Sequence, residues 1–307
     1  MDIRNKYFSR NKTVTNMNKQ IVILCLSSLV ALAPAVPAAN ITWISDQILD
    51  ASSQLPDQGY INLLTAAGHT VTRALAATPS AAALNSANLV ILGRSGASAS
   101  FDTAAETLVW NTQVTVPLIS TNSYFSRSTR LGWYTGGPTQ PDQVLNPLTF
   151  TAGAVSDYIK GSSTGASVTE AVIFPDASVD IRGTSLITDV PVAGATTIAT
   201  TLAGAATATY IATWPSGTTL GGTTSSGQVL AGYRLQFLTG NRESATAPNN
   251  NIGAAGYENL TPEGEQMFLR AVALALNNGA VPVPEAGTSS LALLAGTLLL
   301  TRRRSRA

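Results

Sequence analysis

The chain has 307 residues, of which 45% are hydrophobic and 11% are charged, a composition typical of a folded globular protein rather than a disordered one. Its formal net charge of +1 is misleading, because residues 40–284 contain nine Lys or Arg against fifteen Asp or Glu, a balance of 9 − 15 = −6. A mildly acidic body without a basic stripe argues against nucleic acid as a partner.

The N-terminal segment has the three-part pattern of a secretory signal peptide. Lys19 precedes an apolar run at residues 21–32, and small residues suited to signal peptidase follow. We expect cleavage after Ala38, which removes residues 1–38, and Met17 is an alternative start. An uncleaved membrane anchor is the competing interpretation, but the apolar run is shorter than the ~20 residues that a span needs.

After this leader, apolar runs alternate with segments of helical periodicity. Four runs predict buried strands, at residues 41–44, 71–74, 88–92 and 116–120. Between them we expect one helix that ends at Gly68 and a second that Asp102 caps. Such alternation is typical of a parallel sheet with right-handed crossovers. The sequence therefore predicts one α/β domain over residues 40–280, with a doubly wound, mostly parallel sheet.

The second half of the body predicts further strands and a closing helix. Strands are expected at residues 170–174, 196–200, 207–213 and 228–233. The Thr- and Ala-rich stretch 196–213 is expected to form an antiparallel hairpin at the sheet edge. The closing helix should run from Pro262 to about Asn277, with Thr261 as its N-cap and an apolar stripe facing the core.

A second three-part signal closes the chain over residues 281–307. A Pro-Glu motif, an apolar run and a basic cluster follow one another: Pro284, Glu285 and Ala286; residues 290–300; Arg302, Arg303 and Arg304. This order resembles the PEP-CTERM sorting signal of Gram-negative-type bacteria, which an exosortase recognises and cleaves. Ala286 stands where that family has a second proline.

The PEP-CTERM resemblance implies where the protein goes. We expect the C-terminal helix to insert transiently as an inner-membrane intermediate, since the apolar helix is short for a span and the arginines hold its end in the cytoplasm. Exosortase cleavage would then leave the body in the periplasm, at the cell surface or in the extracellular matrix. A permanent tail anchor is the alternative.

The order of elements in the body resembles the class I glutamine amidotransferase-like group, with ThuA-like proteins as the nearest relatives. Three segments carry the likeness, which spans residues 41–278: residues 67–69, 89–95 and 260–264. The resemblance implies a sheet of the flavodoxin type. Amidotransferases use a Cys-His-Glu set, and the one cysteine, Cys25, lies in the leader. We therefore expect no such catalysis, no thiolate metal site and, in the absence of any cofactor motif, no cofactor.

Ser95 is the residue that comes nearest to imitating the missing nucleophile, because it directly follows the third predicted strand. A serine nucleophile usually takes histidine as its base. The sole histidine, His69, precedes the second strand and should lie at the opposite edge of the sheet, ~15 Å away. We expect His69 to have a turn or capping role.

Arginines and aromatic residues gather after the third and fourth strands. Arg94, Arg127 and Arg130 should converge at the carboxyl edge, because neighbouring parallel strands end on the same side. Guanidinium groups bind carboxylates bidentately, and Trp133 offers a face for stacking. An anionic ligand such as an acidic sugar would suit this set. The alternative is that the arginines brace a long loop while Trp133 packs in the core.

Three acids, Asp46, Asp50 and Asp57, follow the first strand at the same edge. Their spacing matches no calcium loop, and solvated loop carboxylates are the expected state. Asp46 is placed within reach of the arginines as part of the candidate ligand site.

Two functions follow from these patterns. The first is a non-catalytic envelope or extracellular protein whose body binds a carbohydrate or another anionic ligand, with exopolysaccharide or surface matrix as the partner. The second is an extracellular carbohydrate-active hydrolase that uses Asp46 and another carboxylate at the carboxyl edge of the sheet.

Overall fold

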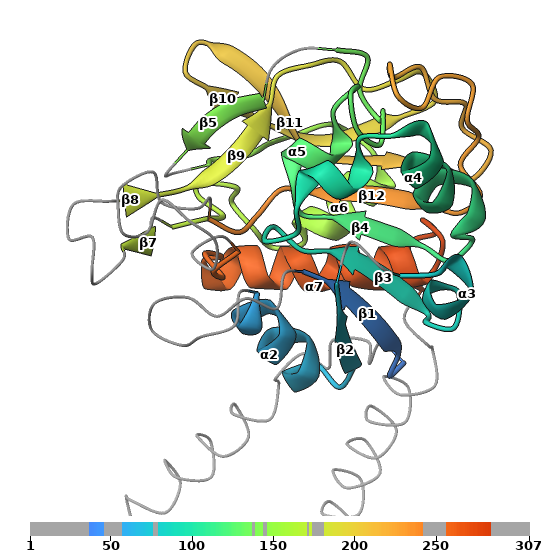
Figure 1. Cartoon of the computed structure of the whole chain (residues 1–307). Helices are drawn as coiled ribbons and strands as arrows, with labels where there is room; N and C mark the ends of the chain where they lie inside the picture. The colour runs from blue at the N-terminus through green and yellow to red at the C-terminus, as the bar shows by residue number, and fades with distance from the viewer. Residues whose placement is uncertain are drawn as a thin grey trace, which may run out of the picture. The chain divides into compact units, whose positions relative to one another are not determined.

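The computed structural model describes residues 37–45, 57–75, 79–136, 139–143, 146–170, 172–173, 181–241 and 256–283. Within this part of the chain, ten strands form one mixed β-sheet with helices beside it (Figure 1). Most of the predicted leader and of the predicted sorting tail, together with Asp46 and Asp50, lies outside the described residues.

Five strands form the parallel half of the sheet. In spatial order they are β2 (Thr70–Ala74), β1 (Asn40–Ile44), β3 (Leu89–Leu92), β4 (Leu118–Ser120) and β12 (Arg234–Phe237). Each strand runs parallel to its neighbours, and β3, β4 and β12 are buried throughout, as their continuous apolar character predicts. The α/β class and the four early strands are therefore confirmed.

The last parallel strand begins later than the sequence pattern indicated. The expected strand at residues 228–233 is wrong, and β12 starts at Arg234. A Cβ on Gly232 would lie 2.8 Å from the carbonyl oxygen of Val116, so the chain makes a close backbone approach there and joins β4 only afterwards.

The other half of the sheet is antiparallel. It consists of β11 (Ala206–Trp214), β10 (Thr196–Ala203), β6 (Thr149–Phe150), β9 (Thr184–Ile187) and β5 (Thr139–Gln143). The predicted hairpin is present as β10 and β11, but β6 pairs with the outer side of β10, so the hairpin is not the edge. The strand expected at residues 170–174 is only β7 (Val172–Ile173), which pairs with β8 (Ile181–Arg182) outside the main sheet.

The helices are short, with one exception. They are α2 (Gln58–Ala66), α3 (Ala81–Leu84), α4 (Ala104–Leu108), α5 (Ser123–Ser126), α6 (Ala154–Lys160) and α7 (Pro262–Leu276), with a 3-10 turn η1 (Ser98–Phe101) and a π-helical turn η2 (Val109–Gln113). The expected cap Asp102 is wrong, because Thr103 caps α4 through a reciprocal capping box with Glu106.

The closing helix α7 matches its prediction closely. Thr261 accepts a hydrogen bond from the Gly264 amide at 3.1 Å, and Pro262 occupies the first turn. Figure 1 shows α7 running along the sheet, where it contacts β4 and β12. The Phe268 ring packs 5.5 Å from that of Phe237 in β12 and 5.7 Å from that of Tyr60 in α2, which ties both helices to the sheet.

One compact unit, Ala38–Val283, contains the described core. No helix in the described ranges is long and apolar enough to cross a membrane.

Candidate functional site at the carboxyl edge of the parallel strands

Backbone hydrogen bonds hold the carboxyl ends of four parallel strands together. The Gly93 amide donates to the Ile44 carbonyl at 2.8 Å, and the Thr121 amide donates to the Leu92 carbonyl at 3.0 Å. The Thr239 amide donates in turn to the Thr121 carbonyl at 3.2 Å. Residues that follow β1, β3, β4 and β12 therefore share one edge, the position at which open α/β sheets bind ligands.

A fully buried aspartate lies at this edge. Asp57 is the N-cap of α2, and its φ of 61° places it in the left-handed region, which Asp tolerates better than most residues. Its amide donates to the Gly256 carbonyl at 3.0 Å, and its Oδ2 accepts a short hydrogen bond from the Ser95 hydroxyl. Its Oδ1 meets no donor among the described residues. The expectation of a solvated loop acid is therefore wrong for Asp57.

Two glycines, Gly93 and Gly256, let the backbone close around this carboxylate, and a third, Gly240, lies against Arg94. A Cβ on Gly93 would lie 2.7 Å from Asp57 Oδ2, and one on Gly256 would overlap Oδ1. A Cβ on Gly240 would lie 2.8 Å from the Cβ of Arg94. Gly240 and Gly256 also have positive φ values of 81° and 86°, which favour glycine independently of the space.

Burial decides the protonation of this carboxyl group. Desolvation raises the pKa of Asp57 from its ordinary value of 3.8 to about 6. The Ser95 hydroxyl, the Trp43 indole and the positive charges of Arg73 and Arg94 act in the opposite direction and only partly offset it. Asp57 therefore titrates near neutral pH.

A network of neutral side chains positions the helix that carries Asp57. The Tyr60 hydroxyl shares a 2.7 Å hydrogen bond with Thr239 Oγ1 and donates to Asn259 Oδ1 at 3.2 Å. The same Asn259 oxygen accepts from the Gly240 amide at 2.9 Å. These bonds join α2 to the end of β12 and to the segment that leads into α7.

Two arginines contact one tyrosine ring beside the Asp57–Ser95 pair. The Cζ atom of Arg94 lies 5.3 Å from the centre of the Tyr124 ring, and that of Arg127 lies 5.4 Å from the same centre. Asn122 fixes this arrangement, because its Oδ1 accepts from the Tyr124 amide at 2.9 Å and its Nδ2 donates to the Arg94 carbonyl at 3.1 Å.

The positive charge of this group is only partly compensated by the described residues. Arg130 Nη2 lies 3.9 Å from Asp102 Oδ2, and Arg130 Nη1 donates to the Thr129 carbonyl at 2.7 Å. By contrast, no described carboxylate lies within ion-pair distance of Arg127. Burial lowers the pKa of Arg127, and repulsion from Arg130 lowers it further. Arg127 is half-buried, and its Nε is buried with no hydrogen-bond partner among the described residues.

The structure thus brings Arg94, Ser95, Arg127 and Arg130 to the predicted edge and removes Trp133 from the ligand-facing set. Trp133 is fully buried, its ring centre lies 5.2 Å from that of Trp214, and its Nε1 donates to Asn111 Oδ1 at 3.2 Å. Trp133 is therefore a core residue, whereas Tyr124, which the sequence analysis did not select, supplies the aromatic face.

His69 lies at the other end of the sheet, as predicted. It immediately precedes β2, its amide donates to the Leu64 carbonyl at 3.1 Å where α2 ends, and burial lowers the pKa of its imidazole. Its position in that turn agrees with the predicted turn role.

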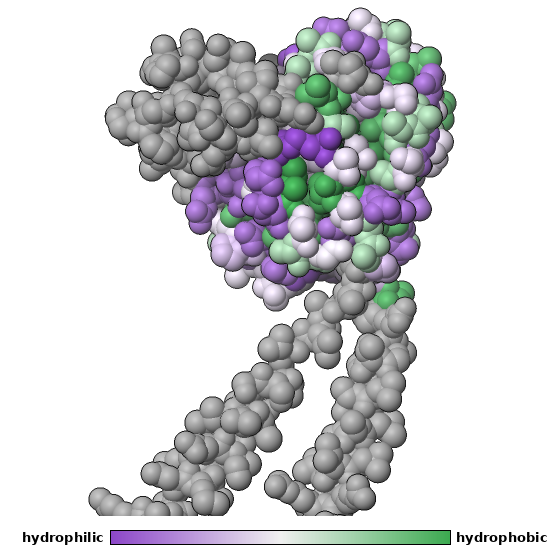
Figure 2. All heavy atoms as spheres, turned by 60° about the horizontal axis from the view of Figure 1, so that its bottom comes forward, coloured by the Kyte–Doolittle hydropathy of each residue, from purple (hydrophilic) through white to green (hydrophobic). Residues whose placement is uncertain are grey.

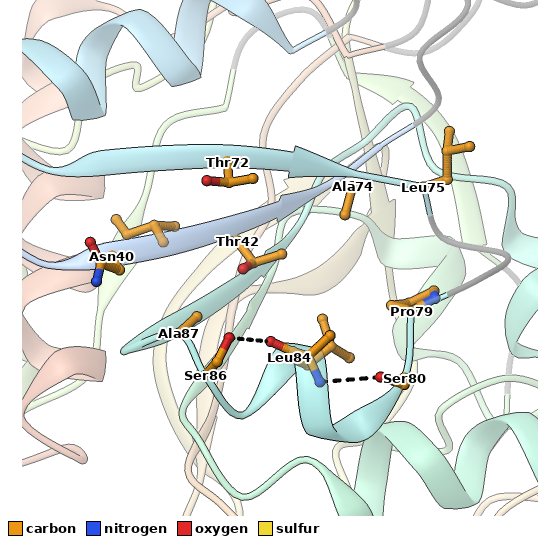
Figure 3. Close-up of a pocket in the computed structure, with 12 residues that line it drawn as sticks. Asn40, Thr42, Thr72, Ala74, Leu75, Pro79, Ser80, Leu84, Ser86 and Ala87 are labelled. Atoms are coloured by element: carbon orange, nitrogen blue, oxygen red, sulfur yellow. Dashed lines mark hydrogen bonds between the residues drawn. The ribbon is translucent and has the colours of Figure 1, made fainter.

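A cavity of about 580 Å³ lies beside β1, β2 and α3 (Figure 3). Its walls include Thr42 and Thr72 from the strands and Ser80 and Leu84 from the α3 segment, and it shares no residue with the arginines or Asp57. Figure 2 shows hydrophilic and hydrophobic residues side by side over the coloured part of one face of the molecule.

Comparison of the sequence with protein-family models and with curated proteins found no match. Among the residues that the structure describes, no group of three or more His, Cys, Asp or Glu side chains could hold a metal ion. The geometry of the carboxyl edge therefore carries the functional argument.

Proposed function

We propose that the chain is an exported protein, sorted by its PEP-CTERM-like tail, whose α/β body binds an anionic ligand at the carboxyl edge, with an acidic carbohydrate as the leading candidate. The observation that carries this proposal is the placement of Arg94 and Arg127 over the same Tyr124 ring. Cations and an aromatic face at one place suit a ligand that has both a carboxylate and an apolar sugar face.

Electrostatics supports an anionic rather than a neutral ligand. Residues 40–284 have a net charge of 9 − 15 = −6, yet Arg127 and Arg130 lie close enough to repel each other. Repulsion between like charges persists in the free protein and is relieved when an anion binds between them. A ligand carboxylate would therefore be attracted to this group despite the acidic body.

The strand order supports the proposed relationship to flavodoxin-type and amidotransferase-like sheets. The parallel half reads β2-β1-β3-β4-β12, which is the 2-1-3-4-5 order of flavodoxin-like sheets when β12 is counted fifth. Amidotransferase chemistry is not part of the proposal, because Cys25 is the only cysteine of the chain. Glutaminase assays on residues 38–283 should release no ammonia above buffer.

Binding is tested with residues 38–283, the compact unit that contains the core. A glycan array should select acidic over neutral saccharides, and calorimetry on the selected saccharide should show that Arg127→Ala weakens binding by ~1.5 to 3 kcal/mol, the scale of a hydrogen bond to a charged group. Arg270→Ala is the matched control, because Arg270 donates to the carbonyls of Ile159 and Lys160 instead. Equal losses in both variants would overturn the proposed site.

Export and sorting are tested by mass spectrometry of the protein from its native host. The mature chain should begin near Ala39 and end near Pro284 or Glu285. A chain that still has Arg302, Arg303 and Arg304 would contradict processing by an exosortase.

A further inference from the structure

The Asp57–Ser95 pair is not explained by anion binding, because it presents a carboxylate rather than a cation. Ser95 follows β3 within a tight turn, in which the Gly96 amide donates to the Gly93 carbonyl at 3.4 Å. Ser95 is the third residue after a parallel strand, on a turn at the carboxyl edge, and this position in the sheet is similar to that of the serine nucleophile in α/β hydrolases.

The exposed fractions of Ser95 and Asp57 suggest different roles for the two side chains. Ser95 is 8% exposed, whereas Asp57 is 0% exposed and lies behind it. The serine hydroxyl donates to Asp57 Oδ2, so the proton that a nucleophile must lose already points at a carboxylate. Asp57 therefore occupies the position of a general base for Ser95, a role that His69 cannot take because it lies at the other end of the sheet.

The environment of Asp57 also suits a base. Its Oδ1 has no hydrogen-bond donor among the described residues, and burial outweighs the stabilisation that the Ser95 hydroxyl, the Trp43 indole, Arg73 and Arg94 give to the charged form. Burial raises the pKa of Asp57 to about 6, and a base is most effective when its pKa lies near the working pH. A solvated aspartate, with its lower pKa, would be a much weaker base at neutral pH.

We propose that Ser95 and Asp57 form a nucleophile–base pair that hydrolyses carboxylic esters at the carboxyl edge of the sheet. This inference goes beyond the proposed binding function and does not depend on it. An O-acyl group on a saccharide held by the neighbouring arginines would be one such ester.

The reaction needs only water as co-reactant. Ser95 Oγ attacks the acyl carbon while its proton passes to Asp57 Oδ2, and the bond between the acyl carbon and the alcohol oxygen then breaks as the alcohol takes that proton. Water attacks the acyl–Ser95 ester, gives a proton to Asp57, and the carboxylic acid leaves as Ser95 takes the proton back. Arg94 adjoins Ser95 in the chain, and its charge, like that of Arg73, acts on Asp57, so Arg94 is the cation that we expect to stabilise the oxyanion formed in each step.

The pair is tested by covalent labelling. Residues 38–283 are incubated with a fluorophosphonate probe, and intact-mass and peptide mass spectrometry locate the adduct. We expect one adduct, on Ser95, and we expect Ser95→Ala to lose it. The control Ser100→Ala should keep the adduct, because Ser100 is a half-buried serine of η1 whose side chain makes no hydrogen bond to the described residues. Folded wild-type protein that takes up no probe, or takes it up elsewhere, would overturn the proposal.

The role of Asp57 is tested by the pH dependence of 4-nitrophenyl acetate hydrolysis. The wild-type rate should rise with pH through a midpoint near 6, and Asp57→Asn should lose about 100-fold or more, the usual contribution of a general base. Circular dichroism tests whether each variant is folded. If Asp57→Asn does not fold, the rate of Ser95→Ala still tests the proposal. An unchanged rate in folded Ser95→Ala would contradict the nucleophile–base pair. The proposed ligand binding by Arg127 would still stand in that case, because it is measured separately.

Discussion

Two buried ionisable side chains, Arg234 and Asp57, lie at opposite ends of the parallel strands and differ in how many hydrogen bonds their surroundings provide. Both are 0% exposed. Arg234 is the first residue of β12, so it lies at the amino end, whereas Asp57 lies at the carboxyl edge. Burial lowers the pKa of Arg234 to about 9 and raises the pKa of Asp57 to about 6, so each charge is disfavoured by desolvation.

The difference lies in how far each group is satisfied. The terminal nitrogens of Arg234 donate to a fan of backbone carbonyls at 2.6 to 3.4 Å: Trp110, Asn111, Val114, Val116 and Tyr233. Several of these belong to η2 or to the segment after it, where carbonyls lack helical partners. Arg234 thus joins the end of η2 to β4 and β12 through hydrogen bonds. Of its nitrogens only Nε lacks a hydrogen-bond partner in the described ranges.

Asp57 shows the opposite balance. One oxygen accepts from Ser95 and the other meets no donor among the described residues. A buried charge whose hydrogen bonds are nearly complete braces a fold, whereas a buried charge left partly unsatisfied is costly. Arg234 therefore has a structural role at the amino end of the sheet, and the less satisfied Asp57 lies at the carboxyl edge, where we propose the functional site.

The largest effect should come from removing the brace. Arg234→Met leaves several buried carbonyls without donors, and we expect it to lower the free energy of unfolding by ~3 to 5 kcal/mol. Urea denaturation measures this. Arg270→Met is the control, because Arg270 is only part-buried and makes two bonds of 3.3 Å. A loss no greater than that of the control would contradict the role of Arg234.

The next effect concerns pH. Because burial raises the pKa of Asp57 from 3.8 to about 6, the native state holds this proton more tightly than the unfolded state does. The resulting stability is complete below about pH 4 and is lost as pH rises through 6, a change of ~3 kcal/mol at ~1.4 kcal/mol per pH unit. Asp57→Asn should remove it, so the difference between wild type and variant isolates this group. A difference that stays constant from pH 4 to 8 would show that Asp57 is not desolvated.

A smaller effect should follow from filling the wall around Asp57. Gly256→Ala adds a methyl group against Asp57 Oδ1 at a φ of 86°, whereas Gly204→Ala places one at a φ of 63° with no atom within 4 Å. Gly204→Ala should cost ~1 kcal/mol for the backbone alone, and Gly256→Ala should cost ~1 to 3 kcal/mol more. Thermal denaturation compares the two variants. Equal costs would mean that Gly256 does not confine the carboxylate.

The smallest effect is expected at the arginines. Arg127 has no ion-pair partner among the described residues and lies near Arg130, so Arg127→Ala should change the unfolding free energy by less than ~0.5 kcal/mol while weakening ligand binding. A large loss of stability would instead favour the interpretation that the arginines brace a loop.

How much of this could be predicted depends on the range of the interactions. Local signals located β1 to β4 and α7, since an apolar run, a Thr261 cap and a following proline act within a few residues. The start of β12 failed because it depends on the approach of Gly232 to Val116, which no local pattern records. β5, β6 and β9 are short and pair over long separations, so they carried no signal.

The site divides in the same way. Topology alone placed Arg94, Arg127 and Ser95 at one edge, because residues after parallel strands meet there. The burial of Asp57 was missed, since it requires Gly256, from a distant part of the chain, to close over the carboxylate. For Trp133 the sequence left two interpretations open, and the alternative, packing in the core, is correct; no local pattern could choose it, because its partners Trp214 and Asn111 come from other elements.

The most direct test of the distinction between the two ends is the titration of Asp57 itself. Carbon-detected NMR of residues 38–283 follows the side-chain carboxyl resonance with pH, and the resonance is assigned by its absence in Asp57→Asn. A midpoint near pH 6 is the result expected of a buried carboxylate with one oxygen unsatisfied. A midpoint at or below 3.8, the ordinary pKa of an aspartate, would mean that Asp57 is solvated or fully paired, and would contradict the proposed role of Asp57 at the carboxyl edge.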